Sequence, residues 1–176
     1  MTIVDEMLIP ALDKTGADFE SGRIFLPQLI LSAGVAQAAF EVIKSKISKD
    51  GNSVSKGKVV LATVKGDIHD IGKNIVKVLL ENYGYEVIDL GRDVEYQAVA
   101  DAAMPDDVKL VGLSALMTTT LKSMEETIAL LRKVKPEIKI VVGGAVLTPE
   151  YAEKIGADFY AKDAKATVDA ARQIYG

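Results

Sequence analysis

Apolar residues near the start of the chain recur every three or four positions, a spacing typical of amphipathic helices. Two stretches show this spacing, residues 7–19 and residues 25–47. Pro27 lies near the start of the second, where a helix tolerates proline. Two helices provide little core of their own, so we expect them to pack on the rest of the chain or to be the remainder of a larger cap. The polar, Gly- and Ser-rich residues 48–58 follow and predict a linker.

The pattern then changes to short apolar runs that alternate with helical spacing. Five runs predict buried strands, at residues 58–64, 85–91, 109–116, 138–144 and 157–161. The helical stretches between and after them are residues 73–84, 96–104, 120–134, 149–156 and 165–175. This alternation predicts an α/β fold: a five-stranded parallel, doubly wound sheet of the flavodoxin or Rossmann type, with helices on both faces. The expected organisation is a helical cap at 1–50, a linker at 51–57 and the sheet domain at 58–176.

The composition excludes several classes of function and of binding site. The chain has 176 residues and a net charge of −4, and its Lys and Arg residues are spread without a basic patch, which argues against a nucleic-acid partner. It contains no cysteine, which excludes a disulfide scaffold, a thiolate nucleophile and a Cys-ligated metal. It has no apolar run long enough to span a bilayer and no signal-peptide pattern at its start, so we expect a cytoplasmic protein with no membrane partner.

The chain has a single histidine, His69, within the polar segment VKGDIHDIGKN, residues 64–74. The preceding strand is expected to end near Val64 and the next helix to begin near Lys73, which places His69 at the edge of the sheet where ligands bind. Asp67 can accept a hydrogen bond from one ring nitrogen and leave the other free as a ligand. A lone imidazole suits a metal that brings its own equatorial ligands, such as cobalt in a corrinoid or iron in a porphyrin. An ordinary loop histidine remains the alternative at this point.

The string VKGDIHDIGKNIV contains the motif Asp-x-His-x-x-Gly and resembles corrinoid methyl carriers of cobalamin-dependent methyltransferase systems, and the cobalamin-binding domain of methionine synthase. GLSAL resembles the Ser-x-Leu that this family has on its third strand, and VVGGA its Gly-Gly after the fourth. DFESGRIFLPQL resembles the helical cap of these proteins, so the resemblance covers nearly the whole chain.

The resemblance implies cobalamin or a related corrinoid, bound base-off and histidine-on, with His69 as the lower axial ligand of cobalt and Asp67 and Thr120 as its proton relay. Ser114 and Thr118 can hydrogen-bond the nucleotide tail, and glycine at 143–144 allows close approach; a core hydroxyl and a plain turn are the alternatives. Phe19 and Leu26 match the apolar cap residues that cover the methyl-bearing face of the cofactor in this family, and they can equally be residues that only pack the two helices together. The cofactor-binding positions implied are Gly66, Asp67, Ile68, His69, Asp70, Ile71, Gly72, Ser114, Leu116, Thr118, Thr120, Gly143 and Gly144, with Phe19 and Leu26 in the cap.

Two departures from the family pattern stand out. Thr120 occupies the position where methionine synthase has serine; threonine keeps the hydroxyl, and the change favours the small stand-alone carriers. The family cap is usually a four-helix bundle, whereas this chain predicts two helices, so the cap is either shortened or completed by another copy or partner.

The function implied is a corrinoid protein that carries a methyl group between a donor methyltransferase and an acceptor methyltransferase that uses tetrahydrofolate or a thiol. Cobalt would cycle through methyl, Co(I) and Co(II) forms, a reductive activation protein would be a further partner, and the protein alone would not be catalytic. Because Co(I) prefers four ligands, His69 would leave and be protonated. The alternatives are a B12-binding sensor or regulatory module, the small subunit of an adenosylcobalamin mutase, and a flavodoxin-like domain without a corrinoid.

Overall fold

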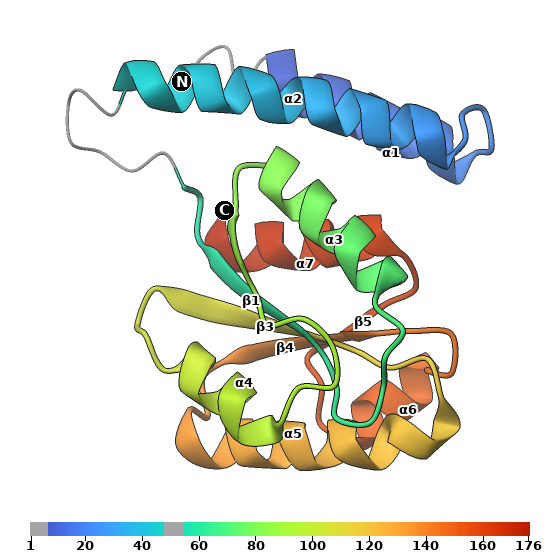
Figure 1. The fold of residues 1–176 in the computed structure, drawn as a ribbon, viewed down its shortest axis with the longest axis vertical. Helices are drawn as coiled ribbons and strands as arrows, with labels where there is room; N and C mark the ends of the chain where they lie inside the picture. The colour runs from blue at the N-terminus through green and yellow to red at the C-terminus, as the bar shows by residue number, and fades with distance from the viewer. Residues whose placement is uncertain (1–6, 48–54) are drawn as a thin grey trace.

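The computed structural model describes residues 7–47 and 55–176 (Figure 1). Five parallel strands form one sheet in the order β2-β1-β3-β4-β5. The strands are β1 (Lys58–Thr63), β2 (Glu86–Asp89), β3 (Val108–Ser114), β4 (Lys139–Gly143) and β5 (Phe159–Ala161). The predicted five-stranded parallel, doubly wound fold is therefore confirmed. Because the strand order reverses at β1, with β2 on one side of it and β3 on the other, the switch point where ligands bind lies at the carboxyl ends of β1 and β3.

Helices cover both faces of this sheet (Figure 1). One face carries α3 (Ile71–Asn82) and α7 (Ala164–Tyr175), and the opposite face carries α4 (Tyr96–Ala103), α5 (Leu121–Val134) and α6 (Pro149–Lys154). A short 3₁₀ turn, η3 (Thr118–Thr120), leads into α5. Along β1, Val59 and Leu61 join the core beneath α3 and α7, whereas Val60 and Ala62 join the core on the other face. Burial on both faces explains why the strands read as continuous apolar runs.

The first two helices, α1 (Ile9–Glu20) and α2 (Leu26–Ile47), form a hairpin that packs against α3 on the side away from the sheet (Figure 1). Leu12, Leu29 and Ala36 are the buried apolar side chains of the hairpin among those the structure describes, and they share a core with Leu80 and Tyr83 of α3 and its carboxyl end. The hairpin thus rests on the outer layer of the sheet domain. Within the described residues, none of the helices is both long and apolar enough to cross a membrane.

Candidate functional site

The histidine loop, residues 64–70, connects β1 to α3. The helix begins at Ile71, two residues before the expected start near Lys73, because the amide of Asn74 already donates to the carbonyl of Asp70 at 2.8 Å. Gly72 therefore belongs to the first turn of α3 and not to the loop. Gly66, with φ of 85°, makes the tight turn that carries the chain out of the strand.

Asp67 holds the His69 ring in one orientation. The ring Nδ1 lies 2.8 Å from Asp67 Oδ1, and the backbone amide of His69 donates to the same oxygen at 3.0 Å. The Asp67 side chain is fully buried, whereas the His69 side chain is 45% exposed. Since Nδ1 is directed at a carboxylate, Nε2 is the nitrogen left to bind a ligand.

The other carboxylate oxygen of Asp67 is anchored by the segment that follows β3. Oδ2 accepts hydrogen bonds from the amides of Leu116 at 2.7 Å and Met117 at 3.2 Å, and it lies 2.9 Å from the Thr120 hydroxyl. The single Thr120 proton can also go to the Met117 carbonyl at 2.8 Å. The predicted grouping of Asp67, His69 and Thr120 is present in the structure, and three backbone amides also donate to the carboxylate.

Burial by itself would raise the pKa of the Asp67 carboxyl, but the hydrogen bonds from the His69 and Leu116 amides, the His69 ring and Thr120 outweigh it and lower this pKa well below its usual range. Asp67 is therefore ionised at neutral pH. An ionised Asp67 accepts the Nδ1 proton and fixes the His69 tautomer with a lone pair on Nε2.

This depressed pKa predicts an acid-sensitive fold. In cofactor-free protein, the stability that Asp67 contributes is complete above its unfolded-state pKa of about 4 and is lost as the pH falls through the lower folded-state value. Asp67→Asn should lower the free energy of unfolding by about 1–3 kcal/mol at pH 7 and by much less near pH 2. Urea unfolding of both proteins from pH 7 to pH 2 measures the difference, and a difference that is constant with pH would contradict the assignment.

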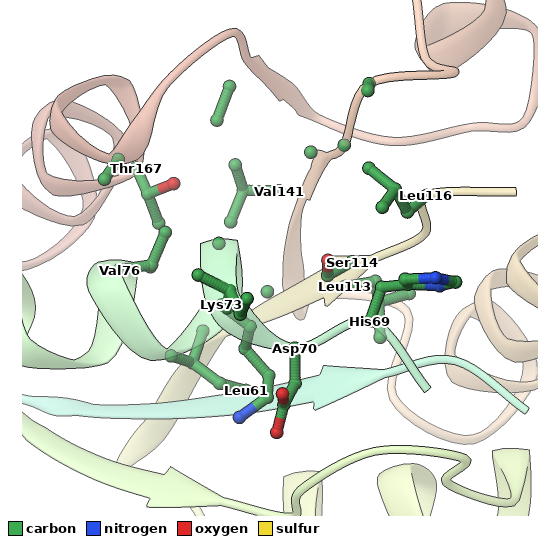
Figure 2. A pocket seen from close by; sticks show the side chains of 18 of the residues that line it. Leu61, His69, Asp70, Lys73, Val76, Leu113, Ser114, Leu116, Val141 and Thr167 are labelled. Atoms are coloured by element: carbon green, nitrogen blue, oxygen red, sulfur yellow. The ribbon is translucent and has the colours of Figure 1, made fainter. Parts of the chain in front are cut away.

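A cavity of about 700 Å³ opens beside His69 and runs between α3 and α7 (Figure 2). His69 and Leu116 lie at one end of it, and Val76 and Thr167 lie at the other. Its size is in the range of sites that bury small organic ligands. The lining is mainly apolar or small, with charged side chains including Asp70, Lys73, Arg92, Lys162 and Asp163.

The structure brings most of the sequence-predicted positions to this cavity. Nine of them line it: Ile68, His69, Asp70, Ile71, Gly72, Ser114, Leu116, Gly143 and Gly144. Asp67 and Thr120 are buried and do not line the cavity; Asp67 contacts the His69 ring, and Thr120 contacts Asp67. Thr118 is exposed and, like Gly66, does not belong to the lining. Phe19 is 37% exposed and does not line the cavity either, and the Leu26 side chain is outside the described residues. The roles of these residues toward a corrinoid stay predictions.

Sequence reasoning missed the inner end of the cavity. Leu61, Gly112 and Val141 lie side by side on β1, β3 and β4, because Gly112 pairs in register with both of the others. Gly112 has no side chain, and a Cβ there would come within 2.5 Å of a Leu61 methyl group. The glycine inside the run KLVGLSAL was the available signal, since a glycine in a strand often marks a close approach.

The side chains that could bind a metal determine which kind of metal cofactor fits the site. No group of three or more His, Cys, Asp and Glu side chains suited to a metal occurs within residues 7–47 and 55–176. A metal held by His69 would therefore have to bring its other ligands, and the adjoining cavity has room for an organic part of such a cofactor. A doubly wound sheet with one carboxylate-held histidine beside a cavity fits a cobalamin-binding domain.

Comparison with known proteins identifies the family. A model of the B12 binding domain matches residues 57–171, and a second B12 binding domain model matches residues 1–44. The chain belongs to the B12-binding family, which confirms the resemblance inferred from the histidine loop.

Similar proteins are corrinoid proteins. Dimethylamine corrinoid protein 1 of Methanosarcina acetivorans is 38% identical over 174 residues, covering 98% of this chain and 82% of the relative. A cobalamin-binding protein from Desulfitobacterium hafniense superimposes with a TM-score of 0.80 at 31% identity, covering 99% of this chain and 90% of the other. The methanol:cobalamin methyltransferase complex of Methanosarcina barkeri gives a TM-score of 0.79 at 32% identity, over 99% of this chain and 67% of that one.

Proposed function

We propose that this protein is a corrinoid methyl carrier that takes a methyl group from a donor methyltransferase and delivers it to an acceptor methyltransferase. The observation that carries the proposal is the single histidine, held by a buried carboxylate at 2.8 Å beside a cavity of about 700 Å³. The similarity to dimethylamine corrinoid proteins and to a methanol:cobalamin methyltransferase complex supports it. The acceptor would be tetrahydrofolate or a thiol, and a reductive activation protein would restore the active form.

The bound corrinoid would supply a cobalt centre that accepts and releases the methyl group. His69 would hold the cobalt through Nε2, and Asp67 would keep the ring oriented by accepting a hydrogen bond from Nδ1–H. Without a bond to the metal, Nε2 could take up a proton, and the ionised Asp67 would stabilise the resulting imidazolium. The Thr120 hydroxyl, 2.9 Å from Asp67 Oδ2, stabilises that carboxylate in turn.

The cavity between α3 and α7 would receive the nucleotide tail with its displaced base, so the cofactor would be bound base-off and histidine-on. The inner end of the cavity is apolar, with Leu61, Val76 and Val141, and suits an aromatic base. At the mouth, Ile68, Ile71 and Leu116 are exposed by 61%, 77% and 41%. These side chains would cover the edge of the corrin ring.

The direct test is reconstitution. Cofactor-free protein mixed with hydroxocobalamin should retain one equivalent through gel filtration, with the spectrum of a base-off, histidine-ligated form. The loaded protein should then accept a methyl group from a donor methyltransferase and substrate such as dimethylamine or methanol. Loss of the corrinoid during gel filtration would contradict the proposal. A preference for an adenosyl over a methyl upper ligand would favour a mutase subunit.

We further propose that Phe19 and Leu26 cover the upper, methyl-bearing face of the corrin. In this structure Phe19 does not line the cavity, and in this proposal the hairpin shifts toward the cavity mouth when the cofactor binds. Such a shift is feasible because the buried leucines of the hairpin, Leu12 and Leu29, each contribute only roughly 1.5–3 kcal/mol.

The absence of cysteine makes this movement measurable. In Phe19→Cys the only thiol replaces a side chain that is 37% exposed, and cobalamin should slow its reaction with a maleimide at least about tenfold, the change expected when a residue becomes covered. Phe25→Cys, at a position 68% exposed, is the matched control for general effects of the ligand. Equal reaction rates at position 19 with and without cobalamin would show that Phe19 is not part of a lid.

A further inference from the structure

A second loop, residues 89–95, which starts at the last residue of β2 and ends before α4, contacts the histidine loop. Its Asp93 contacts the backbone on both sides of the Gly66–Asp67 peptide bond. Asp93 Oδ1 accepts a hydrogen bond from the Gly66 amide at 2.8 Å, and the Asp93 amide donates to the Asp67 carbonyl at 2.9 Å. Asp93 thus holds the backbone of the residue that aims His69, although Asp93 itself does not line the cavity.

The backbone conformation of Asp93 indicates that its carboxylate has a specific use. Asp93 has a φ of 55°, in the left-handed region, and is the sole non-glycine residue with positive φ in the described part of the chain. Glycine adopts this conformation at less cost, and asparagine adopts it readily. Neither would supply a charge for Lys65, whose ammonium lies 3.1 Å from Asp93 Oδ1. The Gly66 amide, followed by the Lys65 ammonium, lowers the pKa of the Asp93 carboxyl, which is therefore ionised at neutral pH.

The far end of the histidine loop is tied to the same loop through Asp89. Lys73, in the first turn of α3, is 3% exposed, and its ammonium forms an ion pair with Asp89 Oδ1 at 2.5 Å. The Gly91 amide donates to that same oxygen at 2.9 Å. The 89–95 loop therefore fixes both the start of the histidine loop and the start of the helix that follows it.

We propose that Asp93 is a positioning residue for His69: by fixing the backbone at Gly66 and Asp67, it sets where the imidazole stands relative to the cavity. Two loops then hold Asp67 at different atoms. Leu116, Met117 and Thr120, after β3, contact its carboxylate, whereas Asp93, after β2, contacts its main chain. The positional effect is a property of the cofactor-free protein, and its consequence for cobalt rests on the proposed function.

Three variants separate the contributions. Asp93→Gly removes the carboxylate and relieves the backbone strain, so any loss of order reports the missing contacts. Asp93→Asn keeps an acceptor for the Gly66 amide in a residue that tolerates this φ. Glu95→Gln is the matched control, because Glu95 lies in the same loop and pairs with the same Lys65 ammonium at 3.0 Å without a contact to the Gly66 amide.

The first measurement uses cofactor-free protein. Hydrogen exchange of the Gly66 amide in Asp93→Gly should be at least about tenfold faster than in wild type, while core strand amides exchange at the wild-type rate. Because the chain has one histidine, its imidazole ¹⁵N signals are unambiguous and should lose the uniform Nδ1-protonated tautomer in this variant. Glu95→Gln should behave as wild type. Asp93→Asn keeps the acceptor for the Gly66 amide and loses the charge paired with Lys65, so it should fall between wild type and Asp93→Gly.

The second measurement uses protein loaded with cobalamin and reduced to Co(II), where the nitrogen splitting of the electron paramagnetic resonance signal reports the axial imidazole. Asp93→Gly should lose part of this splitting at an unchanged melting temperature. Unaltered exchange and ¹⁵N signals in Asp93→Gly, or faster exchange spread over the whole sheet, would overturn the positioning role. Failure of wild type to retain cobalamin would refute the proposed function alone, because the cofactor-free measurements still test Asp93.

Discussion

His69→Ala should remove the imidazole from cobalt and shift the visible spectrum of the cobalamin-loaded protein to that of a water-ligated form. No other histidine exists in the chain to replace it. Cobalamin affinity should fall by at least about tenfold, the smallest loss typical when the immediate surroundings of a bound metal are changed. Stability should change by less than about 1 kcal/mol, because the His69 side chain is 45% exposed and Asp67 keeps its backbone donors.

Added imidazole provides the matched control for this variant. It should enter the space left by the His69 side chain, bind the cobalt and restore the nitrogen-ligated spectrum in His69→Ala, with no effect on wild type. Asp67→Asn should act more weakly, since it disturbs the tautomer and keeps the ligand. A wild-type spectrum in His69→Ala would mean that something other than His69 holds the cobalt.

Ser114→Leu should abolish stable cobalamin binding by filling the cavity while the fold persists. Ser114 ends β3 and is half-buried in the wall of the cavity (Figure 2). A leucine side chain there occupies space that the nucleotide tail would need, so retention through gel filtration should be lost, a drop in affinity of about 100-fold or more, as expected when a steric clash excludes a ligand.

Ser114→Ala separates volume from hydrogen bonding. It removes the hydroxyl and leaves the cavity open, so its affinity should lie within about tenfold of wild type, the value of one hydrogen bond. Isothermal titration with hydroxocobalamin measures both variants, and circular dichroism checks that they fold. Tight binding by Ser114→Leu would place the tail elsewhere, and a loss in Ser114→Ala as large as in Ser114→Leu would make the hydroxyl, not the volume, decisive.

The sequence by itself determined the layers of the fold and, within the site, the pairing of Asp67 with His69. Continuous apolar runs of strand length alternating with helical spacing identify a parallel sheet, because burial on both faces removes the polar alternation of a half-exposed strand. Asp67 and His69 are two residues apart, so their hydrogen bond depends on local geometry that a short motif can specify. The same motif identified the family.

Contacts between distant segments were decided only by the tertiary structure. Asp67 meets the Leu116 amide 49 residues further along the chain, and Gly66 meets Asp93 27 residues further along. Both contacts depend on the order β2-β1-β3, which places the loops after β2 and β3 on either side of the histidine loop. Local spacing contains no information about that order.

The residues at the inner end of the cavity and the packing position of the hairpin also could not be predicted from the sequence. Leu61, Gly112 and Val141 become neighbours through strand register, and a shift of one residue would turn each to the other face of the sheet. The hairpin packs on α3 because Leu12 and Leu29 find partners there, a choice of surface that the apolar periodicity of α1 and α2 does not encode. Periodicity states which side of a helix is buried, and only the folded chain states against what.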